Sequence, residues 1–218
     1  MPLSPYETLS RLHAAATLRD VYSIEFPLVI APLDSADDFS GFRYESDDLF
    51  RTRGEENTER TIEWDRIIPP AITPVLQSAH MFEQEFSISA RQKWDADIHG
   101  PLDAYNHGIT QSVHVDGAHI PKMRVYFASN KNPTSVVSHE DSLRLYERYA
   151  PSLLDRPMDS EFLQDFMMAN MDLSDHFRRI ASRVPENHLC AMTGVTQHFR
   201  APVIEDSRVF FRARVFGV

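Results

Sequence analysis

The feature that most constrains the fold is a change in hydrophobic period along the second half of the chain. Between residues 108 and 137 the apolar residues fall in short runs, separated by turn sequences such as Asn-Lys-Asn-Pro at 130–133. Short runs of β-branched and aromatic residues bounded by turn residues indicate β-strands. The pattern returns in LCAMTGVTQHF (189–199) and SRVFFRARVFGV (207–218), which we interpret as the last two strands. The sequence therefore predicts a mainly β fold with flanking helices.

Three helices are predicted from their starting residues. Ser4-Pro5-Tyr6-Glu7 has a capping hydroxyl, a proline in the first turn and a glutamate three residues after the cap, and we expect this helix to end near Asp20. Thr73-Pro74 begins a second helix, which is expected to last to about Phe86. Ser138, followed three residues later by an aspartate, predicts the start of a third.

A longer helix is expected between about residues 159 and 184. Its apolar residues recur at the spacing that one buried stripe requires, namely Phe162, Phe166, Leu173, Phe177 and Ile180. Residues 21–33 are interpreted as an extended or edge-strand segment, because two prolines interrupt them. The polar residues 34–61 are expected to be rich in loops.

Length and charge limit the possible partners. A chain of 218 residues suffices for one domain, and we expect N-terminal helices and substrate-side loops over 1–107, then a β core over 108–218 with a helical insertion at about 138–184. The net charge of −10 opposes binding to nucleic acid or to an anionic membrane. The single cysteine, Cys190, cannot form an internal disulfide, and the start of the chain lacks the pattern of a secretory signal. We therefore expect a cytoplasmic protein whose partner is a small molecule.

The first candidate for chemistry is His114-Val115-Asp116. Residues two apart on a strand point to the same face, so the imidazole and the carboxylate would project together as two metal ligands. A second pattern of this kind, His139-Glu140-Asp141, is rejected as a metal clamp because it lies at the start of the helix capped by Ser138. His198 and Arg208 lie at the end of one predicted strand and the start of the next.

A His-x-Asp pair, a distant histidine and an arginine about ten residues further resemble the Fe(II)/2-oxoglutarate-dependent oxygenases, whose core is a double-stranded β-helix of the jelly-roll or cupin-like kind. The stretch after the pair is similar to the taurine dioxygenase branch, with an apolar strand from Arg124, a turn to Thr134, a short strand and the helix from Ser138. The order is also similar to that of small bacterial hydroxylases of free aliphatic amino acids. The resemblance covers roughly residues 108–218, and Lys131-Asn132-Pro133 departs from the usual Gly-Gly-Asp before the threonine.

This resemblance implies a metal site and a cosubstrate site. His114, Asp116 and His198 would hold Fe(II) and leave three positions for 2-oxoglutarate and O₂. Arg208 would pair with the distal carboxylate of 2-oxoglutarate, and Thr134 would hydrogen-bond to the same molecule.

The last predicted strand has three arginines, Arg208, Arg212 and Arg214, an even number of residues apart. If Arg208 points inward, period-two alternation sends Arg212 and Arg214 inward too, and three arginines need more than one counter-ion. Either a bulge breaks the alternation, or Arg212 holds an acidic group of the prime substrate while Arg214 reaches the open end of the barrel. Arg212 and Arg124 are the candidates for binding the prime substrate.

The expected activity is oxidation, by default hydroxylation, of an unactivated C–H bond in a small metabolite such as a free amino acid, with decarboxylation of 2-oxoglutarate to succinate. Two alternatives remain open at this point. One is a cupin-type metalloenzyme that does not use 2-oxoglutarate, which would have no use for the Arg208 anchor. The other is a β-barrel binding module with no metal and no enzymatic activity.

Overall fold

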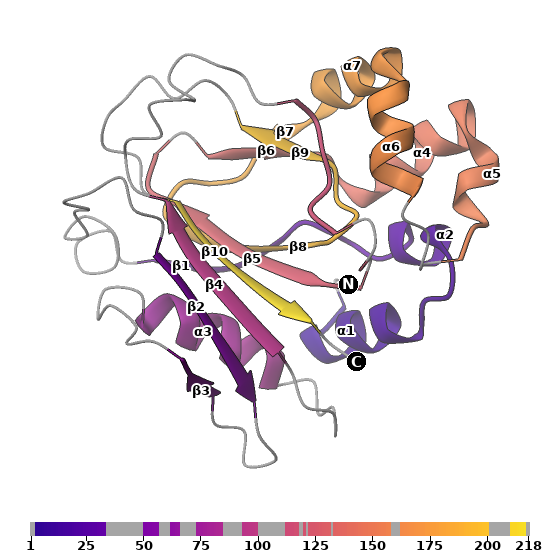
Figure 1. Ribbon diagram of the computed structural model, residues 1–218. Coiled ribbons are helices and arrows are strands. Elements are labelled where there is room, and N and C mark those ends of the chain that lie inside the picture. The colour runs from indigo at the N-terminus through magenta and orange to yellow at the C-terminus, as the bar shows by residue number, and fades with distance from the viewer. Residues whose placement is uncertain are drawn as a thin grey trace.

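The computed structural model describes residues 3–33, 50–56, 62–65, 73–84, 93–99, 112–117, 120, 122–131, 133–157, 162–200 and 210–216. Within this part of the chain, two antiparallel β-sheets are accompanied by helices (Figure 1). The prediction of a mainly β fold with flanking helices is therefore confirmed.

The larger sheet has seven strands in the order β1-β8-β5-β10-β4-β2-β3. Its strands are β1 (Leu28–Pro32), β2 (Phe50–Glu56), β3 (Ile62–Trp64), β4 (Lys93–His99), β5 (Arg124–Ser129), β8 (His188–Thr193) and β10 (Phe210–Phe216). The expected edge strand in 21–33 is found as β1. Strand β2 lies inside the polar region expected to be loops, and its charged residues alternate with Thr52 and Gly54. Strand β4 was not predicted, although its charged residues alternate with Trp94, Ala96 and Ile98 at the period of a strand.

The smaller sheet has three strands in the order β7-β6-β9 and lies above the larger one in Figure 1. These strands are β6 (Thr134–Val136), β7 (Ser182–Arg183) and β9 (His198–Arg200). His114 extends this sheet on the far side of β9 through an isolated bridge to His198. The predicted strand at 189–199 is in fact two strands, β8 in the large sheet and β9 in the small one, with a turn at 194–197 between them.

The helices are α1 (Pro5–Ala14), α2 (Leu18–Tyr22), α3 (Thr73–Gln84), α4 (His139–Tyr149), α5 (Pro151–Leu154), α6 (Phe162–Ala169) and α7 (Met171–Ile180). In the part of the chain that is described, no helix combines the length and the apolar character needed to cross a membrane. Helices α1 and α4 begin at the predicted caps, because the hydroxyls of Ser4 and Ser138 each accept a hydrogen bond from the amide three residues later.

Two helices are shorter than the sequence predicts. The first ends at Ala14, because Thr17 and Asp20 form a second capping box that starts α2. The long helix expected over 159–184 is divided into α6 and α7 at Asn170, whose backbone leaves the helical conformation and whose side-chain amide donates to Phe166 O at 2.7 Å. Asparagine competes for backbone hydrogen bonds in this way, so a continuous apolar stripe does not ensure a continuous helix.

The two faces of the large sheet pack against different partners. Alternate residues of β10, Phe211, Ala213 and Val215, belong to the main core with the helices. The residues between them face the other way, where a second apolar cluster joins both sheets through Met123, Val125, Phe127, Val136, Val184, Cys190 and Met192. We call this second side the inner face, because it is enclosed between the large and the small sheet.

Candidate metal centre

His114 and His198 are held side by side by the small sheet. The amide of each donates to the carbonyl of the other at 3.0 Å, so the two residues form a bridged antiparallel pair. Residues directly opposite in such a pair point to the same face of the sheet. The two imidazole rings accordingly lie with their centroids 4.2 Å apart. Backbone pairing thus brings together two histidines that are far apart in the sequence.

Both rings are oriented by the same local hydrogen bond. The Nδ1 atom of His114 lies 2.8 Å from Ser112 O, and that of His198 lies 3.0 Å from Thr196 O. A carbonyl oxygen only accepts, so each Nδ1 carries the proton, and in the neutral ring the lone pair is on Nε2. Metal-binding histidines are commonly fixed by such a bond from the second ring nitrogen.

Asp116 completes the cluster. Its Oδ1 lies 3.8 Å from Nε2 of His114, and its Oδ2 lies 3.6 Å from Nε2 of His198. These distances are longer than hydrogen bonds, so the two rings and the carboxylate face one another without being bonded. Among the described residues, these three form the one group of His, Cys, Asp or Glu whose potential ligand atoms all lie within 4.8 Å of one another.

The protonation states favour a cation at this position. Burial lowers the pKa of His198 to about 4, against the opposing effect of the nearby Asp116 carboxylate. Burial opposes ionisation of Asp116, but the charges of His198, Arg212 and His114 outweigh it and hold the pKa of that carboxyl below its usual range. At neutral pH the lone pair of His198 therefore faces an ionised carboxylate. Such a donor set of two imidazoles and one carboxylate fits a divalent transition metal.

The structure brings Arg212 to this cluster. Its guanidinium donates to Asp116 Oδ2 at 3.3 Å, and both side chains are largely buried. Strand β10 pairs with β5 and β4 in continuous register from Phe210 to Val215, without a bulge. Over these residues the alternation is therefore unbroken, and Arg212 lies on the inner face opposite Phe127.

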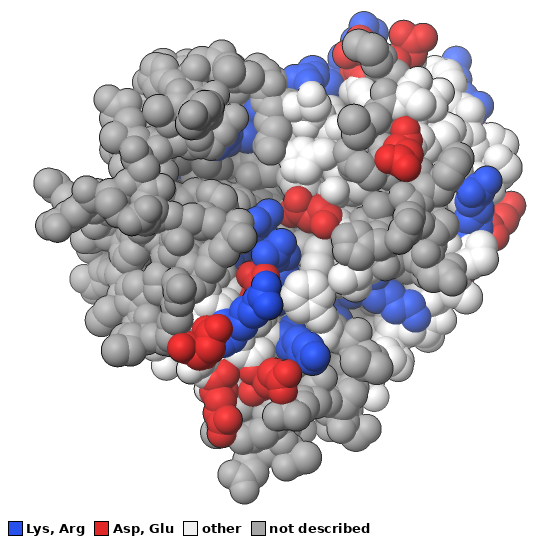
Figure 2. All heavy atoms as spheres, in the orientation of Figure 1, with Lys and Arg blue, Asp and Glu red and all other residues white. Residues whose placement is uncertain are grey.

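Arg214 lies on the same face and has its own counter-ion. Its guanidinium donates to Asp95 Oδ2 at 2.7 Å across the β10–β4 pair. The next strand places Arg53 opposite Asp95, so charges alternate across three neighbouring strands. Figure 2 shows side chains of both signs next to one another over this part of the molecule. Arg212 and Arg214 are thus each matched with a separate carboxylate, Asp116 and Asp95.

Of the two residues expected to bind 2-oxoglutarate, Thr134 lies within the described part of the chain. Thr134 is buried in β6, two residues before Val136, which pairs with His198. Its side chain therefore lies on the same face of the small sheet as the imidazole of His198. Arg208 lies outside the described residues.

The structure does not bring Arg124 to the cluster. Its partner in β10 is Val215, which belongs to the main core, so its side chain lies on the opposite face of the sheet from Arg212. There the Arg124 guanidinium donates to both oxygens of Glu83 on α3, at 2.9 and 2.8 Å. Tyr126 also donates to Glu83. Arg124 is therefore part of a buried structural ion pair rather than of the candidate centre, and this is a correction to the sequence interpretation.

Two glycines hold the loop that carries Asp116 against the β8–β9 turn. The amide of Gly117 donates to Gly194 O at 2.8 Å, and the amide of Gly194 donates to Met123 O at 2.8 Å. A Cβ atom at residue 194 would lie 2.7 Å from Ile120 O and 3.3 Å from the Cα of Gly117. Only glycine allows the two backbones to approach this closely.

Sequence reasoning missed the groups that orient the ligands. Ser112 and Thr196 act through their backbone carbonyls, which no residue type reveals. The one sequence signal is the position of each acceptor, two residues before its histidine. That spacing alone is not diagnostic, because His188 makes the same contact to Glu186 O outside the cluster.

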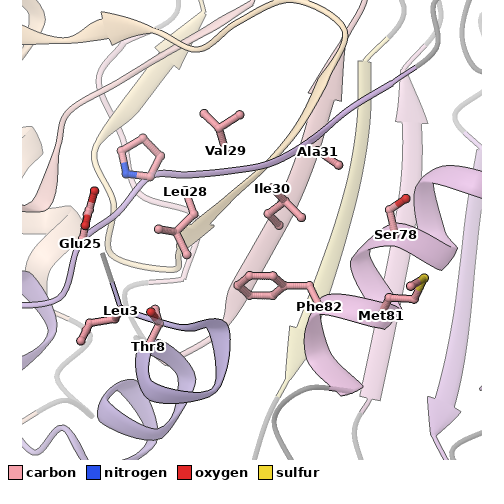
Figure 3. Close-up of a pocket in the computed structure, with 11 residues that line it drawn as sticks. Leu3, Thr8, Glu25, Leu28, Val29, Ile30, Ala31, Ser78, Met81 and Phe82 are labelled. Atoms are coloured by element: carbon pink, nitrogen blue, oxygen red, sulfur yellow. The ribbon is translucent and has the colours of Figure 1, made fainter. Parts of the chain in front are cut away.

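A hollow of about 660 Å³ lies elsewhere, between α1, β1 and α3 (Figure 3). Its walls are mainly apolar and include Leu28, Ile30, Met81 and Phe82. None of the three clustered residues lines it. The hollow and the candidate metal centre are therefore separate features.

Comparison with solved structures finds similarity at a TM-score of 0.40. No family model matches the sequence, and no curated protein matches it. The structure is similar to EvdMO1, with a TM-score of 0.40 and 10% identity, over 97% of this chain and 50% of that one. It is similar to SnoK, a non-heme alpha-ketoglutarate-dependent carbocyclase from nogalamycin biosynthesis, with a TM-score of 0.40 and 12% identity, over 99% and 86%. It is also similar to IDO from Bacillus thuringiensis, with a TM-score of 0.40 and 7% identity, over 99% and 95%. The chain spans half the length of EvdMO1.

Proposed function

We propose that this chain is an Fe(II)/2-oxoglutarate-dependent oxygenase that hydroxylates an unactivated C–H bond of a small metabolite, such as a free amino acid or a related acid. The observation that carries the proposal is the convergence of His114, Asp116 and His198, whose Nε2 and carboxylate atoms face one another within 4.8 Å. Two histidines and one carboxylate are the donor set of non-haem Fe(II) oxygenases.

The path of the chain supports a jelly-roll core. From β4 onward the chain alternates between the sheets: β4 is in the large one, His114 joins the small one, β5 returns to the large one and β6 to the small one. After β7 the alternation continues through β8, β9 and β10. We infer a double-stranded β-helix, in which the candidate ligands are at one end of the paired strands containing His114 and His198.

In this proposal each group of the chain has one task. His114, His198 and Asp116 hold the iron, which when bound supplies oxygen activation coupled to decarboxylation of 2-oxoglutarate to succinate. Ser112 O and Thr196 O hold the two imidazoles in the tautomer that presents Nε2.

The anions of the reaction are assigned to the arginines and to Thr134. Arg208 anchors the distal carboxylate of 2-oxoglutarate, and Thr134 donates a hydrogen bond to the same molecule. Arg212, which already contacts Asp116, binds an acidic group of the prime substrate. A guanidinium is suited to this role because it makes two parallel hydrogen bonds to a carboxylate.

The test of the proposal begins with metal binding. Protein freed of metal is titrated with Fe(II) under anaerobic conditions, in the wild-type form and as His198→Ala. His188→Ala is the matched control, because His188 makes the same hydrogen bond to a carbonyl two residues earlier but lies outside the cluster. We expect one strong site in wild type and in His188→Ala, and its loss in His198→Ala.

Succinate formation then tests the cosubstrate. It is measured against 2-oxoglutarate concentration over a panel of amino acids and small acids, with Arg208→Ala and Arg212→Ala beside wild type. If the protein binds no metal, the binding-module alternative holds. If it binds metal but forms no succinate with any member of the panel and consumes no 2-oxoglutarate, a cupin-type metalloenzyme replaces the proposal.

A further inference from the structure

The turn that precedes His198 is attached to the helices by a buried polar network. The side-chain amide of Gln197 donates to the hydroxyls of Tyr22 at 2.7 Å and Tyr146 at 2.9 Å. Its carbonyl oxygen accepts from the hydroxyl of Ser142 at 2.7 Å. We call Tyr22, Ser142, Tyr146 and Gln197 the turn network. All four side chains are almost completely buried, so water does not replace any of these bonds.

The turn network acts on the backbone next to His198. Three consecutive carbonyls in this turn each have a specific partner. Val195 O accepts from the Tyr22 hydroxyl at 2.9 Å, Thr196 O accepts from His198 Nδ1 at 3.0 Å, and Gln197 O accepts from the amide of Val137 at 2.9 Å. The carbonyl that orients the His198 ring is therefore flanked on both sides by peptide groups whose positions are fixed.

A second contact from α4 holds the same turn. His139 Nδ1 lies 3.0 Å from the carbonyl oxygens of both Val21 and Ile24, so it carries the proton and its Nε2 accepts. Nε2 lies 2.9 Å from the hydroxyl of Thr196 and 3.1 Å from that of Thr193. His139 therefore lies behind the turn and holds it, and it does not belong to the metal cluster, as its position at the start of a helix predicts.

We propose that Gln197 is the positioning residue of His198, and that the turn network transmits the packing of α2 and α4 to the metal centre. This inference rests on the proposed function, because it concerns the affinity of the metal site. Gln197 touches neither metal nor substrate. It holds the turn so that Thr196 O and the His198 backbone remain where Nε2 of His198 faces Asp116 and His114.

The turn is sensitive to changes in this network because the Gln197 side chain is buried and fully hydrogen-bonded. Each of the three polar groups of the Gln197 amide, its two N–H bonds and its oxygen, has a partner. Removing one partner leaves a buried polar group without a hydrogen bond, and the turn relaxes to recover one. Substitution of residues that orient metal-binding histidines commonly weakens metal binding about 10- to 100-fold. We therefore expect a shift of this turn to weaken metal binding at the candidate centre.

The experiment measures metal binding without turnover. Apoprotein is titrated with Co²⁺ in the absence of 2-oxoglutarate, at a temperature at which every variant is folded, and the visible absorption of bound Co²⁺ reports its coordination. The variants are Gln197→Met, which removes the amide but keeps the volume, and Tyr146→Phe, which removes one acceptor. Thermal unfolding of each apoprotein is recorded in parallel.

Tyr126→Phe is the matched control. Tyr126 is as buried as Tyr146 and its hydroxyl also makes a hydrogen bond to a buried side chain, that of Glu83, but on the face of the large sheet away from the metal centre. We expect Gln197→Met and Tyr146→Phe to raise the Kd for Co²⁺ by about tenfold or more and to change its absorption. The control should lower the unfolding temperature while leaving Kd and spectrum as in wild type.

The outcomes separate the two proposals. If wild type binds Co²⁺ and both variants of the turn network bind it with the same Kd and spectrum, the network is only structural and the inference is wrong. If Gln197→Met does not fold, Tyr146→Phe alone decides between these results. If wild type itself binds no Co²⁺ or Fe(II), the proposed function fails and this inference fails with it.

Discussion

The buried ion pair of Arg124 and Glu83 allows a direct test of whether Arg124 stabilises the fold or binds the substrate. The guanidinium donates two hydrogen bonds of 2.9 and 2.8 Å to the Glu83 carboxylate, and the two side chains are 6% and 0% exposed. In Arg124→Met the apolar stem is kept, but the buried Glu83 carboxylate loses both guanidinium hydrogen bonds and its counter-ion, while the hydrogen bond from the Tyr126 hydroxyl stays. Breaking a buried pair in this way costs about 3–5 kcal/mol.

That cost is a large part of the free energy of unfolding, which is roughly 5–15 kcal/mol for a domain. The measurement is urea denaturation at 25 °C, followed by circular dichroism. The double variant Arg124→Met with Glu83→Gln removes both charges, and we expect it to be more stable than Arg124→Met alone, because the amide can still accept from Tyr126. In folded Arg124→Met the KM for the prime substrate should equal that of wild type.

Two results would refute this reasoning. A cost below about 1 kcal/mol for Arg124→Met is the value of an exposed ion pair and would mean that the pair is solvated. A strong increase in KM at unchanged stability would return Arg124 to the substrate site that the sequence suggested. Arg212→Met is the comparison for KM, because Arg212 lies on the inner face beside Asp116.

Three further predictions follow from other contacts. Burial lowers the pKa of His139 to about 4, so below pH 6.5 the unfolded state binds more protons at this residue. His139 alone should therefore lower the free energy of unfolding by about 3 kcal/mol as the pH falls from 6.5 to 4, and urea denaturation of His139→Gln should show a correspondingly weaker pH dependence than that of wild type. Gly194→Ala places a Cβ against Ile120 O, so it should lower the free energy of unfolding by about 1–3 kcal/mol and weaken Co²⁺ binding. Gly54→Ala in β2 is the control: its Cβ would be equally crowded, and we expect it to lower the unfolding temperature without changing Co²⁺ binding. Arg212→Ala should leave one Co²⁺ site, because Arg212 is not a ligand, and a loss of metal binding in calorimetric titration would contradict that assignment.

The sequence was sufficient to predict features that depend on neighbouring residues, such as helix caps and the alternation of side chains along a strand. Ser4 and Ser138 start helices because a capping hydroxyl needs only the amide three residues later. Alternation along a strand places Arg212 and Arg214 on one side of β10. These features depend on short stretches of chain, so composition and spacing are enough to predict them. The strand expected around His114 is only an isolated bridge, and Asp116 follows it in a bend, so alternation does not account for the approach of Asp116 to His114.

The tertiary structure decided which groups meet across long separations in the sequence. Alternation says that residues share a face but not what covers that face, so only the packed sheets show that Arg124 meets Glu83 while Arg212 meets Asp116. Likewise, His114 and His198 become neighbours through a backbone bridge. Backbone partners carry no side-chain signature and burial depends on every packed element, so these contacts exist only once the two sheets and the helices have assembled.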